Sequence, residues 1–195
     1  MTKPDTKTHL RQYLDFGREA MLWKLEGLSE YDVRRPMTPT GTNLLGLVKH
    51  LAGVESVYFG ETFGRAFPEH LPWMDDTAEK NADMWATPDE SRADILALYE
   101  RVRAFSDATI AELPLDAPGR VAWWPDERAD VTLDQIIVHV AVETHRHAGH
   151  ADIVRELIDN TVGMRLGREN MPESDAKWWD EYRNTLEQAA RTAAS

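Results

Sequence analysis

The sequence contains no cysteine. This absence excludes disulfide bonds, zinc sites with cysteine ligands and a cysteine nucleophile. Any thiol chemistry carried out by this chain would therefore need a thiol supplied by a small molecule.

Basic residues are scarce relative to acidic ones. The chain carries 22 lysine and arginine residues against 34 aspartate and glutamate residues, so its formal net charge at pH 7 is -12 and its sequence pI is about 5.0. A surface of this sign repels the phosphates of nucleic acids and anionic lipid headgroups. We therefore expect neither nucleic acid nor a membrane as a partner.

Long apolar runs are missing as well. No segment approaches the roughly 18 consecutive apolar residues of a membrane span, and the polar first ten residues lack the apolar core of a secretion signal. We therefore expect a cytoplasmic location. Apolar and polar residues do not alternate over the length of a typical strand. These absences leave an all-α protein as the predicted fold class.

What the sequence does have is a series of helical patterns separated by loops that contain proline. With 195 residues, 42% of them hydrophobic, one domain can bury a sizeable core. The patterns predict four main helices joined by two long loops. The predicted helices cover residues 8–28, 43–64, 88–113 and 133–159, and the predicted loops cover residues 65–86 and 114–130.

The ends of these helices carry typical capping residues. Threonines precede three of the patterns, two of them with Glu or Gln three residues later, as in a capping box. We predict a bundle formed by residues 1–170, and a C-terminal helix within 171–195 that packs on the bundle or is partly flexible. The predicted N-caps are Thr42, Thr87, Thr132 and Ser174.

The fourth predicted helix places ionisable groups on its apolar stripe. At about 100° per residue, His139, Glu143, His147 and His150 of "HVAVETHRHAGHAD" fall within an arc of about 80° that also holds apolar residues. His145 projects elsewhere. Burying unpaired polar groups is costly, so these side chains need hydrogen bonds to one another, water or a metal ion.

A divalent metal would use this spacing well. Glu143 and His147 lie one helical turn apart and can reach a common point. His50, at the edge of the apolar stripe of the second predicted helix, is the candidate third ligand, and three protein ligands would leave an open position as in catalytic sites. The plainer interpretation is a hydrogen-bonded core cluster, in which His139 and His150 support their neighbours.

Two tryptophan pairs stand out in the remaining sequence, Trp123-Trp124 in a predicted loop and Trp178-Trp179 in the C-terminal segment. The first is interpreted as loop packing and the second as part of a core stripe. The alternative for both is a surface that cradles a cofactor.

Four stretches of the chain resemble a known family. They are "MLWKLEGLSE", "GTNLLGLVKHLAGVESVYFG", the tryptophan pair in "VAWWPDE", and "TLDQIIVHVAVETHRHAGHADIVRELIDNTVG". Together they resemble the DinB-like superfamily of metal-binding four-helix bundles, in particular its branch of uncharacterised actinobacterial domains. The resemblance implies a DinB-like four-helix bundle with long connecting loops and a short C-terminal helical appendage.

The resemblance also implies a metal site. The superfamily commonly uses three histidines, and His50 and His147 match two of them, whereas Glu143 occupies the third position and His150 replaces a glutamine. This departure resembles the mycothiol-dependent maleylpyruvate isomerase, whose zinc is held by two histidines and a glutamate. His50, Glu143 and His147 are thus the implied ligands, with zinc expected first and nickel or iron as alternatives. That isomerase has a second domain that this chain is too short to contain, so its reaction is not carried over.

Other relatives resemble S-transferases that use low-molecular-weight thiols such as mycothiol or bacillithiol. The resemblance implies a metal-dependent transferase that conjugates such a thiol to a small electrophile, with the metal activating the thiolate. His150 and His139 are the candidate catalytic residues for proton transfer, and Trp123 and Trp124 are the candidate cofactor-binding residues. Many relatives form homodimers, so a homodimer is expected.

Two rival hypotheses remain open at this stage. The metal could activate water in a hydrolase, with His150 or Glu55 as the general base. The protein could instead be a non-catalytic, metal-binding or stress-associated dimeric bundle.

Overall fold

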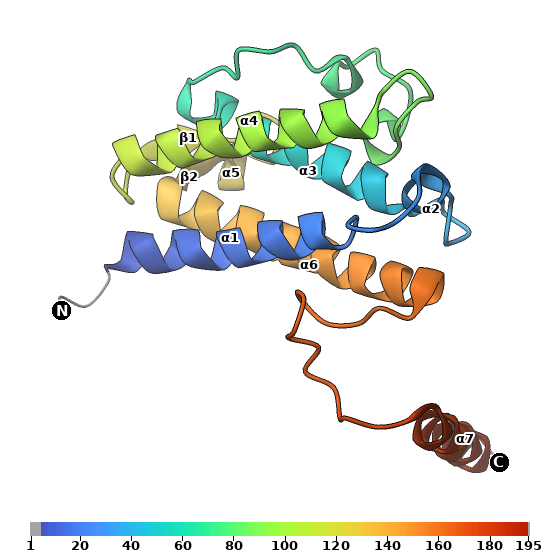
Figure 1. Cartoon of the computed structure of the whole chain (residues 1–195). Helices are drawn as coiled ribbons and strands as arrows, with labels where there is room; N and C mark the ends of the chain where they lie inside the picture. Colours follow the sequence, from blue (N-terminus) through green and yellow to red (C-terminus); the bar gives the residue numbers. More distant parts are fainter. Residues whose placement is uncertain (1–4, 195) are drawn as a thin grey trace.

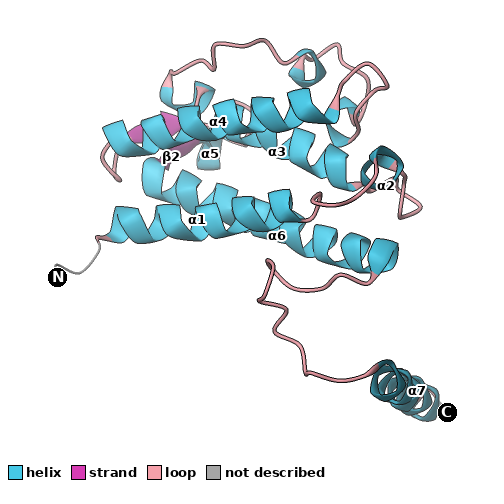
Figure 2. Cartoon of the chain, in the orientation of Figure 1, coloured by secondary structure: helices cyan, strands magenta, loops and turns pink. Residues whose placement is uncertain are grey.

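The structure, a computed structural model, describes residues 5–194 and is mainly α-helical, which confirms the predicted fold class (Figures 1 and 2). The helices and strands are α1 (Thr6–Trp23), α2 (Glu30–Arg34), α3 (Leu44–Tyr58), α4 (Arg92–Glu112), β1 (Pro118–Arg120), α5 (Asp126–Ala129), β2 (Asp130–Thr132), α6 (Leu133–Asp159) and α7 (Ala176–Ala193). Three short 3-10 helices lie between α3 and α4, namely η1 (Glu61–Phe63), η2 (Pro72–Met74) and η3 (Ala82–Met84).

The four long helices α1, α3, α4 and α6 pack together as a bundle. α1 packs along α6, and α3 packs against both α4 and α6 (Figure 1). α3 is buried around most of its circumference. A polar side chain on α3 therefore needs a partner from a neighbouring element.

Helix starts follow the capping side chains closely, but not always the predicted ones. In α1, α3, α4 and α7, the side chains that accept a hydrogen bond from the first turn are Asp5, Asn43, Ser91 and Asp175. The predicted caps Thr42 and Ser174 are thus wrong by one residue, because the neighbouring Asn or Asp forms the bond. Thr132 is the cap of α6 as predicted, although its hydroxyl bonds Asp134 rather than the helix backbone.

The predicted cap Thr87 is wrong by four residues. The carboxylate of Glu90 accepts the hydrogen bond of the Thr87 backbone N–H at 2.7 Å, as in a capping box. This bond closes a turn, and α4 begins only after Ser91. Glu90 also pairs with the buried Lys49 of α3, so the turn is held against the bundle.

The short helix α2 and the strands β1 and β2 were not predicted from the sequence. The first predicted helix ends early, at Trp23, and a turn with Gly27 at φ +74° leads into the short helix α2, capped by Ser29. Strands β1 and β2 form an antiparallel pair with Gly119 opposite Val131. Three residues are too few to show an alternating pattern, which explains why the pair was missed.

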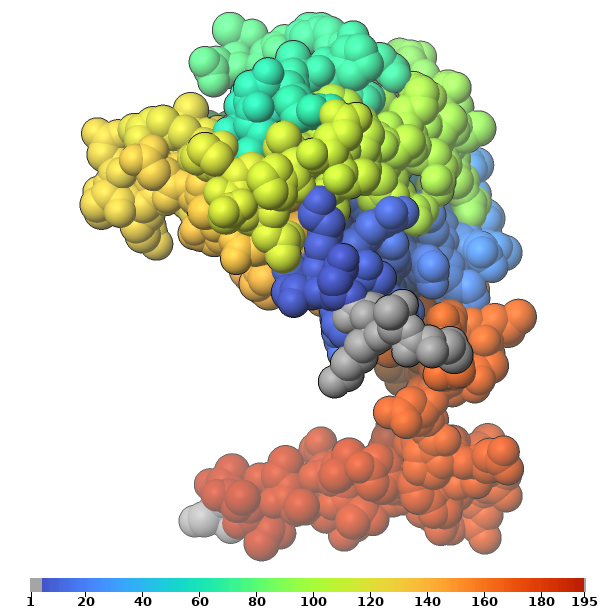
Figure 3. Space-filling model, turned by 90° about the vertical axis from the view of Figure 1, so that its left-hand side faces the viewer, coloured from blue at the N-terminus to red at the C-terminus, as the bar shows by residue number. Residues whose placement is uncertain are grey.

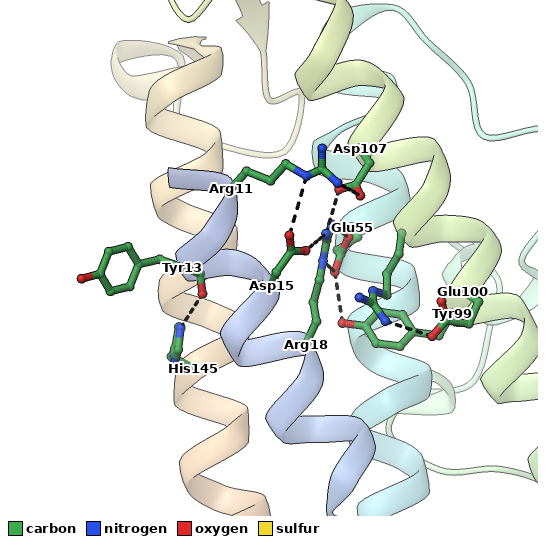
Figure 4. Close-up of polar contacts among 10 residues, drawn as sticks. Arg11, Tyr13, Asp15, Arg18, Glu55, Tyr99, Glu100, Asp107 and His145 are labelled. Carbon is green, nitrogen blue, oxygen red and sulfur yellow. Dashed lines mark hydrogen bonds and ion pairs between the residues drawn. The ribbon is translucent and has the colours of Figure 1, made fainter. Parts of the chain in front are cut away.

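A buried charge network joins three of the long helices (Figure 4). The guanidinium of Arg18 on α1 donates at 2.9 Å to Glu55 on α3, and both side chains are completely buried. Arg18 also bonds Asp15 and Asp107, and the hydroxyl of Tyr99 on α4 donates to Glu55 at 3.1 Å. Burial opposes the charge of Arg18, but Glu55 outweighs it and the pKa of Arg18 is raised, so this guanidinium is charged.

The C-terminal helix α7 lies apart from the bundle (Figures 1 and 3). It buries none of its residues, and Trp178 is 39% exposed. The core stripe expected for Trp178 and Trp179 is therefore not formed within the described part of the chain. The division into 1–170 and 171–195 stays a prediction.

Between residues 5 and 194, no helix combines the length and the apolar character that crossing a membrane requires.

Candidate metal centre

Three side chains converge between α3 and α6, and they are the predicted trio. His50 Nε2 lies 3.6 Å from Glu143 Oε1, and His147 Nε2 lies 3.0 Å from the same oxygen. One potential ligand atom from each side chain lies within 4.8 Å of the other two. The bundle thus brings together residues that are distant in the sequence.

Helix geometry sets the positions of Glu143 and His147, and a contact with the 3-10 helix η3 sets that of His50. Glu143 and His147 are one turn apart on α6, so they point the same way. The His50 ring is held by Asp83 of η3, whose carboxylate lies 2.6 Å from Nδ1. This bond leaves Nε2 facing Glu143. A carboxylate behind a histidine in this way is common beside metal sites, where it fixes the ring and raises its basicity.

Sequence reasoning missed Asp83. It lies in the long loop that was predicted between the second and third helices, among many other acidic residues. No spacing distinguishes it, because its approach to His50 depends on how η3 packs on α3. Gly46 makes that packing close, since a Cβ there would lie 1.8 Å from the carbonyl oxygen of Met84.

The electrostatics of the trio favour the metal-binding protonation states. Burial and the nearby His50 lower the pKa of His147, which is only 8% exposed, so this imidazole stays neutral at neutral pH. Burial alone would raise the pKa of Glu143, but His147 and His50 outweigh it and the pKa is lowered. His147 therefore offers a neutral imidazole nitrogen and Glu143 an ionised carboxylate, the states that bind metals.

This donor set fits a divalent transition metal. Ligand atoms bonded to one zinc ion at about 2.0–2.2 Å lie at most about 4.4 Å from one another, so small side-chain rotations bring the three atoms onto one ion. Two imidazoles and a carboxylate suit zinc, nickel and ferrous iron. Within residues 5–194 the grouping contains His50, Glu143 and His147 alone, which leaves room for a further ligand from outside the chain.

His150 and His139 lie on either side of the trio along α6. His150 is exposed, and its Nδ1 lies 3.3 Å from Nδ1 of His147, so it contacts the ring edge that faces away from Glu143. His139 packs between Tyr58 and Trp124, with ring centroids 4.7 and 5.0 Å away. Burial lowers the pKa of His139, so this ring is neutral at pH 7.

Aromatic side chains form a wall next to His139. The indole N–H of Trp124 donates to the hydroxyl of Tyr58 at 3.2 Å, and Trp123 lies against the same tyrosine with ring centroids 5.2 Å apart. Trp123 is 49% exposed. Trp124 is thus packed within its loop, as interpreted from the sequence. The ring of Trp123 contacts Tyr58 but stays partly exposed to solvent. Tyr58, which organises the wall, was not singled out from the sequence.

The alternative general base Glu55 is not available for catalysis. Its carboxylate is completely buried and already accepts hydrogen bonds from Arg18 and Tyr99. The structure therefore argues against the hydrolase mechanism that relies on Glu55.

Comparison with protein families gives a match to the mycothiol-S-transferase model over residues 9–160. The chain belongs to the mycothiol-S-transferase family. This is a DinB-like family, so the resemblance found in the sequence is confirmed. The matched region includes the trio, Asp83, both flanking histidines and the aromatic wall, whereas α7 lies outside it.

A solved structure supports the same fold. The crystal structure of a conserved protein from Enterococcus faecalis superimposes with a TM-score of 0.57 at 14% sequence identity, and the match covers 82% of this chain and 100% of that one. This similarity shows the fold alone. No curated protein gives a significant match to the chain. At the level of the family, the mycothiol-S-transferase match indicates a transferase that uses a small thiol.

Proposed function

We propose that this mycothiol-S-transferase family member conjugates a low-molecular-weight thiol of the mycothiol type to a small electrophile, at a metal held by His50, Glu143 and His147. The observation that carries the proposal is the convergence of these three side chains, with a neutral His147 and an ionised Glu143, within a chain of this family. Zinc is the first choice of metal, and nickel and iron are the alternatives.

A bound divalent metal with an open position lowers the pKa of a thiol and supplies thiolate, the reactive nucleophile, at neutral pH. The chain itself has no cysteine, so no protein thiol competes for that position. Among its own residues, Glu143 contributes the only negative charge of the trio, and Asp83 keeps the His50 ring in place.

The reaction requires a defined movement of one proton and two electron pairs. The thiol S–H loses its proton to a base, a sulfur lone pair forms the new S–C bond, and the bond from that carbon to the leaving group breaks with its electron pair. We assign the base to His150 or His139. His150 is exposed and can pass a proton to water, whereas His139 is neutral at pH 7 because burial lowers its pKa.

The aromatic wall supports binding of the reactants beside the trio. The ring of Trp123 is half-exposed. The neighbouring Trp124 donates a hydrogen bond to the hydroxyl of Tyr58, which fixes the two rings of the wall relative to each other. Such a surface would bind the apolar part of the electrophile or of the thiol cofactor. Trp123→Ala should therefore raise KM more than it lowers kcat.

The first test measures metal in untagged protein by elemental mass spectrometry. We expect one divalent ion per chain in the wild type, and none in Glu143→Ala or His147→Ala. His145→Ala is the matched control, because His145 lies on the same helix but bonds the backbone carbonyl of Tyr13 instead. A wild type that takes up no zinc, nickel or iron on reconstitution would overturn the proposal.

The second test follows conjugation across a panel of small thiols and electrophiles. Product should form with wild type and the His145→Ala control, and should be lost with the two metal-free variants. A metal-loaded protein that conjugates none of the thiols would refute the transferase. Hydrolysis of esters or amides without any thiol would assign the same centre to a hydrolase instead.

A further inference from the structure

The long connection between α3 and α4, residues 59–91, contains little regular structure (Figure 1). Its regular elements are the 3-10 helices η1, η2 and η3, each of three residues. A helix this short makes too few backbone hydrogen bonds to hold its own position. The place of Asp83 in η3, and with it the contact to His50, therefore depends on the side chains of the bundle that hold this connection.

Lys49 of α3 is a buried cation that touches three parts of this connection. It precedes His50 in the chain and is only 2% exposed. Its ammonium donates to the backbone carbonyl of Trp85 at 3.0 Å and to the carboxylate of Glu90 at 2.9 Å. It also lies 4.4 Å from the centre of the Trp73 ring. One side chain thus contacts η2, the chain directly after η3 and the turn before α4.

Asn43, the cap of α3, holds η3 at a second point. Its side-chain N–H donates to the backbone carbonyl of Met84 at 3.1 Å, while its side-chain oxygen accepts a hydrogen bond from the first turn of α3. Gly46 lets the same carbonyl come close, because it has no Cβ. The two backbone carbonyls directly after Asp83, those of residues 84 and 85, are therefore both bonded to side chains of α3.

The directional hydrogen bond of Lys49 gives a reason for burying a charge at this position. Burying an ammonium costs free energy unless it is paired, and an apolar side chain of similar volume often packs as well as a buried ion pair. An apolar side chain, however, cannot donate to the carbonyl of Trp85. What the lysine adds is thus a fixed backbone position two residues after Asp83.

The position of η3 decides which nitrogen of the His50 ring carries the hydrogen when the ring is neutral. Asp83 lies 2.6 Å from Nδ1, whereas Glu143 lies 3.6 Å from Nε2, beyond a normal hydrogen bond. A carboxylate only accepts, so the hydrogen resides on Nδ1, and Nε2 keeps the lone pair that binds a metal. Without Asp83 at this distance, Glu143 would attract the hydrogen to Nε2 and block that nitrogen.

We propose that Lys49, aided by Asn43, is a positioning residue for the metal centre. By holding the chain directly after η3, it keeps Asp83 against His50 and so selects the ring form whose Nε2 is free to bind a metal. No hydrogen bond or ion pair within residues 5–194 joins Lys49 to the side chains of the trio, so it acts through Asp83. The effect on metal affinity rests on the proposed function, whereas the effect on the ring is a property of the metal-free chain.

Zinc affinity, measured by chelator competition, tests the first effect. Lys49→Met should weaken zinc binding by at least about tenfold, because the histidine ring loses its fixed partner. Lys24→Met is the matched control, since Lys24 is fully buried at the end of α1 and pairs with Asp152 at 2.7 Å. Like Lys49, it also bonds a backbone carbonyl, that of Gly163, and contacts an indole ring. The control should leave zinc affinity unchanged, and an equal loss in both variants would contradict the proposal.

Combining Lys49→Met with Asp83→Ala separates positioning from general damage. Asp83→Ala alone should weaken zinc binding, and adding Lys49→Met should weaken it no further, because no carboxylate is then left to position. Losses that multiply would show that Lys49 acts by another route. Asn43→Ser is a milder variant that serves if Lys49→Met does not fold. Serine still caps α3 but cannot reach the carbonyl of Met84, so zinc affinity should fall, and this fall should also vanish beside Asp83→Ala.

Nitrogen NMR of metal-free protein with isotope-labelled histidine tests the second effect. At about pH 8, where a free imidazole is neutral, wild type and Lys24→Met should carry the hydrogen on Nδ1 of His50. Lys49→Met should populate both ring forms. A wild type with the hydrogen on Nε2, or a Lys49→Met ring identical to that of wild type, would overturn the proposal. This readout needs neither metal nor thiol, so a chain that binds no metal would refute the proposed function alone.

Discussion

Replacing Glu55 with glutamine tests the buried charge network that joins α1, α3 and α4. The substitution keeps the shape of the side chain but removes its charge, and the Arg18 guanidinium then stays buried without its fully buried counter-ion. Removing one partner of a buried ion pair typically costs about 3–5 kcal/mol. Asp15 and Asp107 still contact Arg18, so we expect a loss of about 3 kcal/mol.

Urea unfolding at equilibrium measures this loss. With a denaturant dependence of about 2 kcal/mol per molar urea, a loss of about 3 kcal/mol lowers the midpoint by about 1.5 M. Glu69→Gln is the matched control, because Glu69 makes the same two-bond contact with Arg101 at the exposed surface. Exposed pairs contribute little, so the midpoint of this variant should barely move.

The comparison of the two variants decides the outcome. If Glu55→Gln moves the midpoint no further than Glu69→Gln does, the network does not hold the three helices together and the reasoning is wrong. Replacing Arg18 and Glu55 together with methionine and leucine should recover only part of the loss, because both fully buried charges are removed but the buried Tyr99 hydroxyl loses its acceptor.

The metal centre and the packing around it give three further expectations. Asp83→Ala should weaken metal binding by about 10- to 100-fold, measured by chelator competition, because the His50 ring loses its 2.6 Å partner. Gly46→Ala should lower the free energy of unfolding by about 1–3 kcal/mol, measured in urea, because its Cβ would meet the Met84 carbonyl at 1.8 Å. Thermal unfolding in chelator should show stability falling as pH drops through 6.5, because burial lowers the pKa of His147 and the unfolded chain takes up a proton that the folded chain resists.

Matched variants separate these effects from general damage. Asp89→Ala removes an exposed aspartate and should leave metal affinity unchanged. Gly149→Ala places its Cβ in open space, so it should stabilise α6 by up to about 1 kcal/mol. A Gly46→Ala variant as stable as Gly149→Ala would contradict the close packing of η3 on α3. A stability profile around pH 6.5 that His147→Gln leaves unchanged would contradict the pKa argument.

The sequence predicts the long elements well because their signals are local and repeated. The bounds of α6 follow from its long helical pattern, its cap at Thr132 and Asn160, which takes the left-handed conformation at φ +62° where the helix ends. The predicted start of α4 was wrong because it depended on a single short motif rather than on a repeated pattern. The Glu90 carboxylate accepts from the Thr87 backbone N–H in a turn that precedes α4, so the motif alone does not fix where a helix begins.

The candidate site was predictable only in part. Spacing along one helix brings Glu143 and His147 together, and the bundle then places His50 opposite them. Asp83 was not predictable, because its position depends on a loop that crosses α3. The buried ion pair of Arg18 and Glu55 was not predictable either. Hydrophobic periodicity assigns charged residues to the exposed face of a helix and does not identify their partners.

The trio has a consequence for how the chain folds. His50 lies before α4 and the long loops, whereas Glu143 and His147 follow them, so an ion held by all three would close a loop of about 90 residues. Such an ion would tie α3 to α6 in the folded chain and stabilise it by binding the folded state in preference to the unfolded one, whereas a disulfide persists when a protein unfolds. The metal supply would then determine the lifetime of the protein in the cell as well as its activity. A chain that has lost its ion would unfold more often and would be degraded sooner.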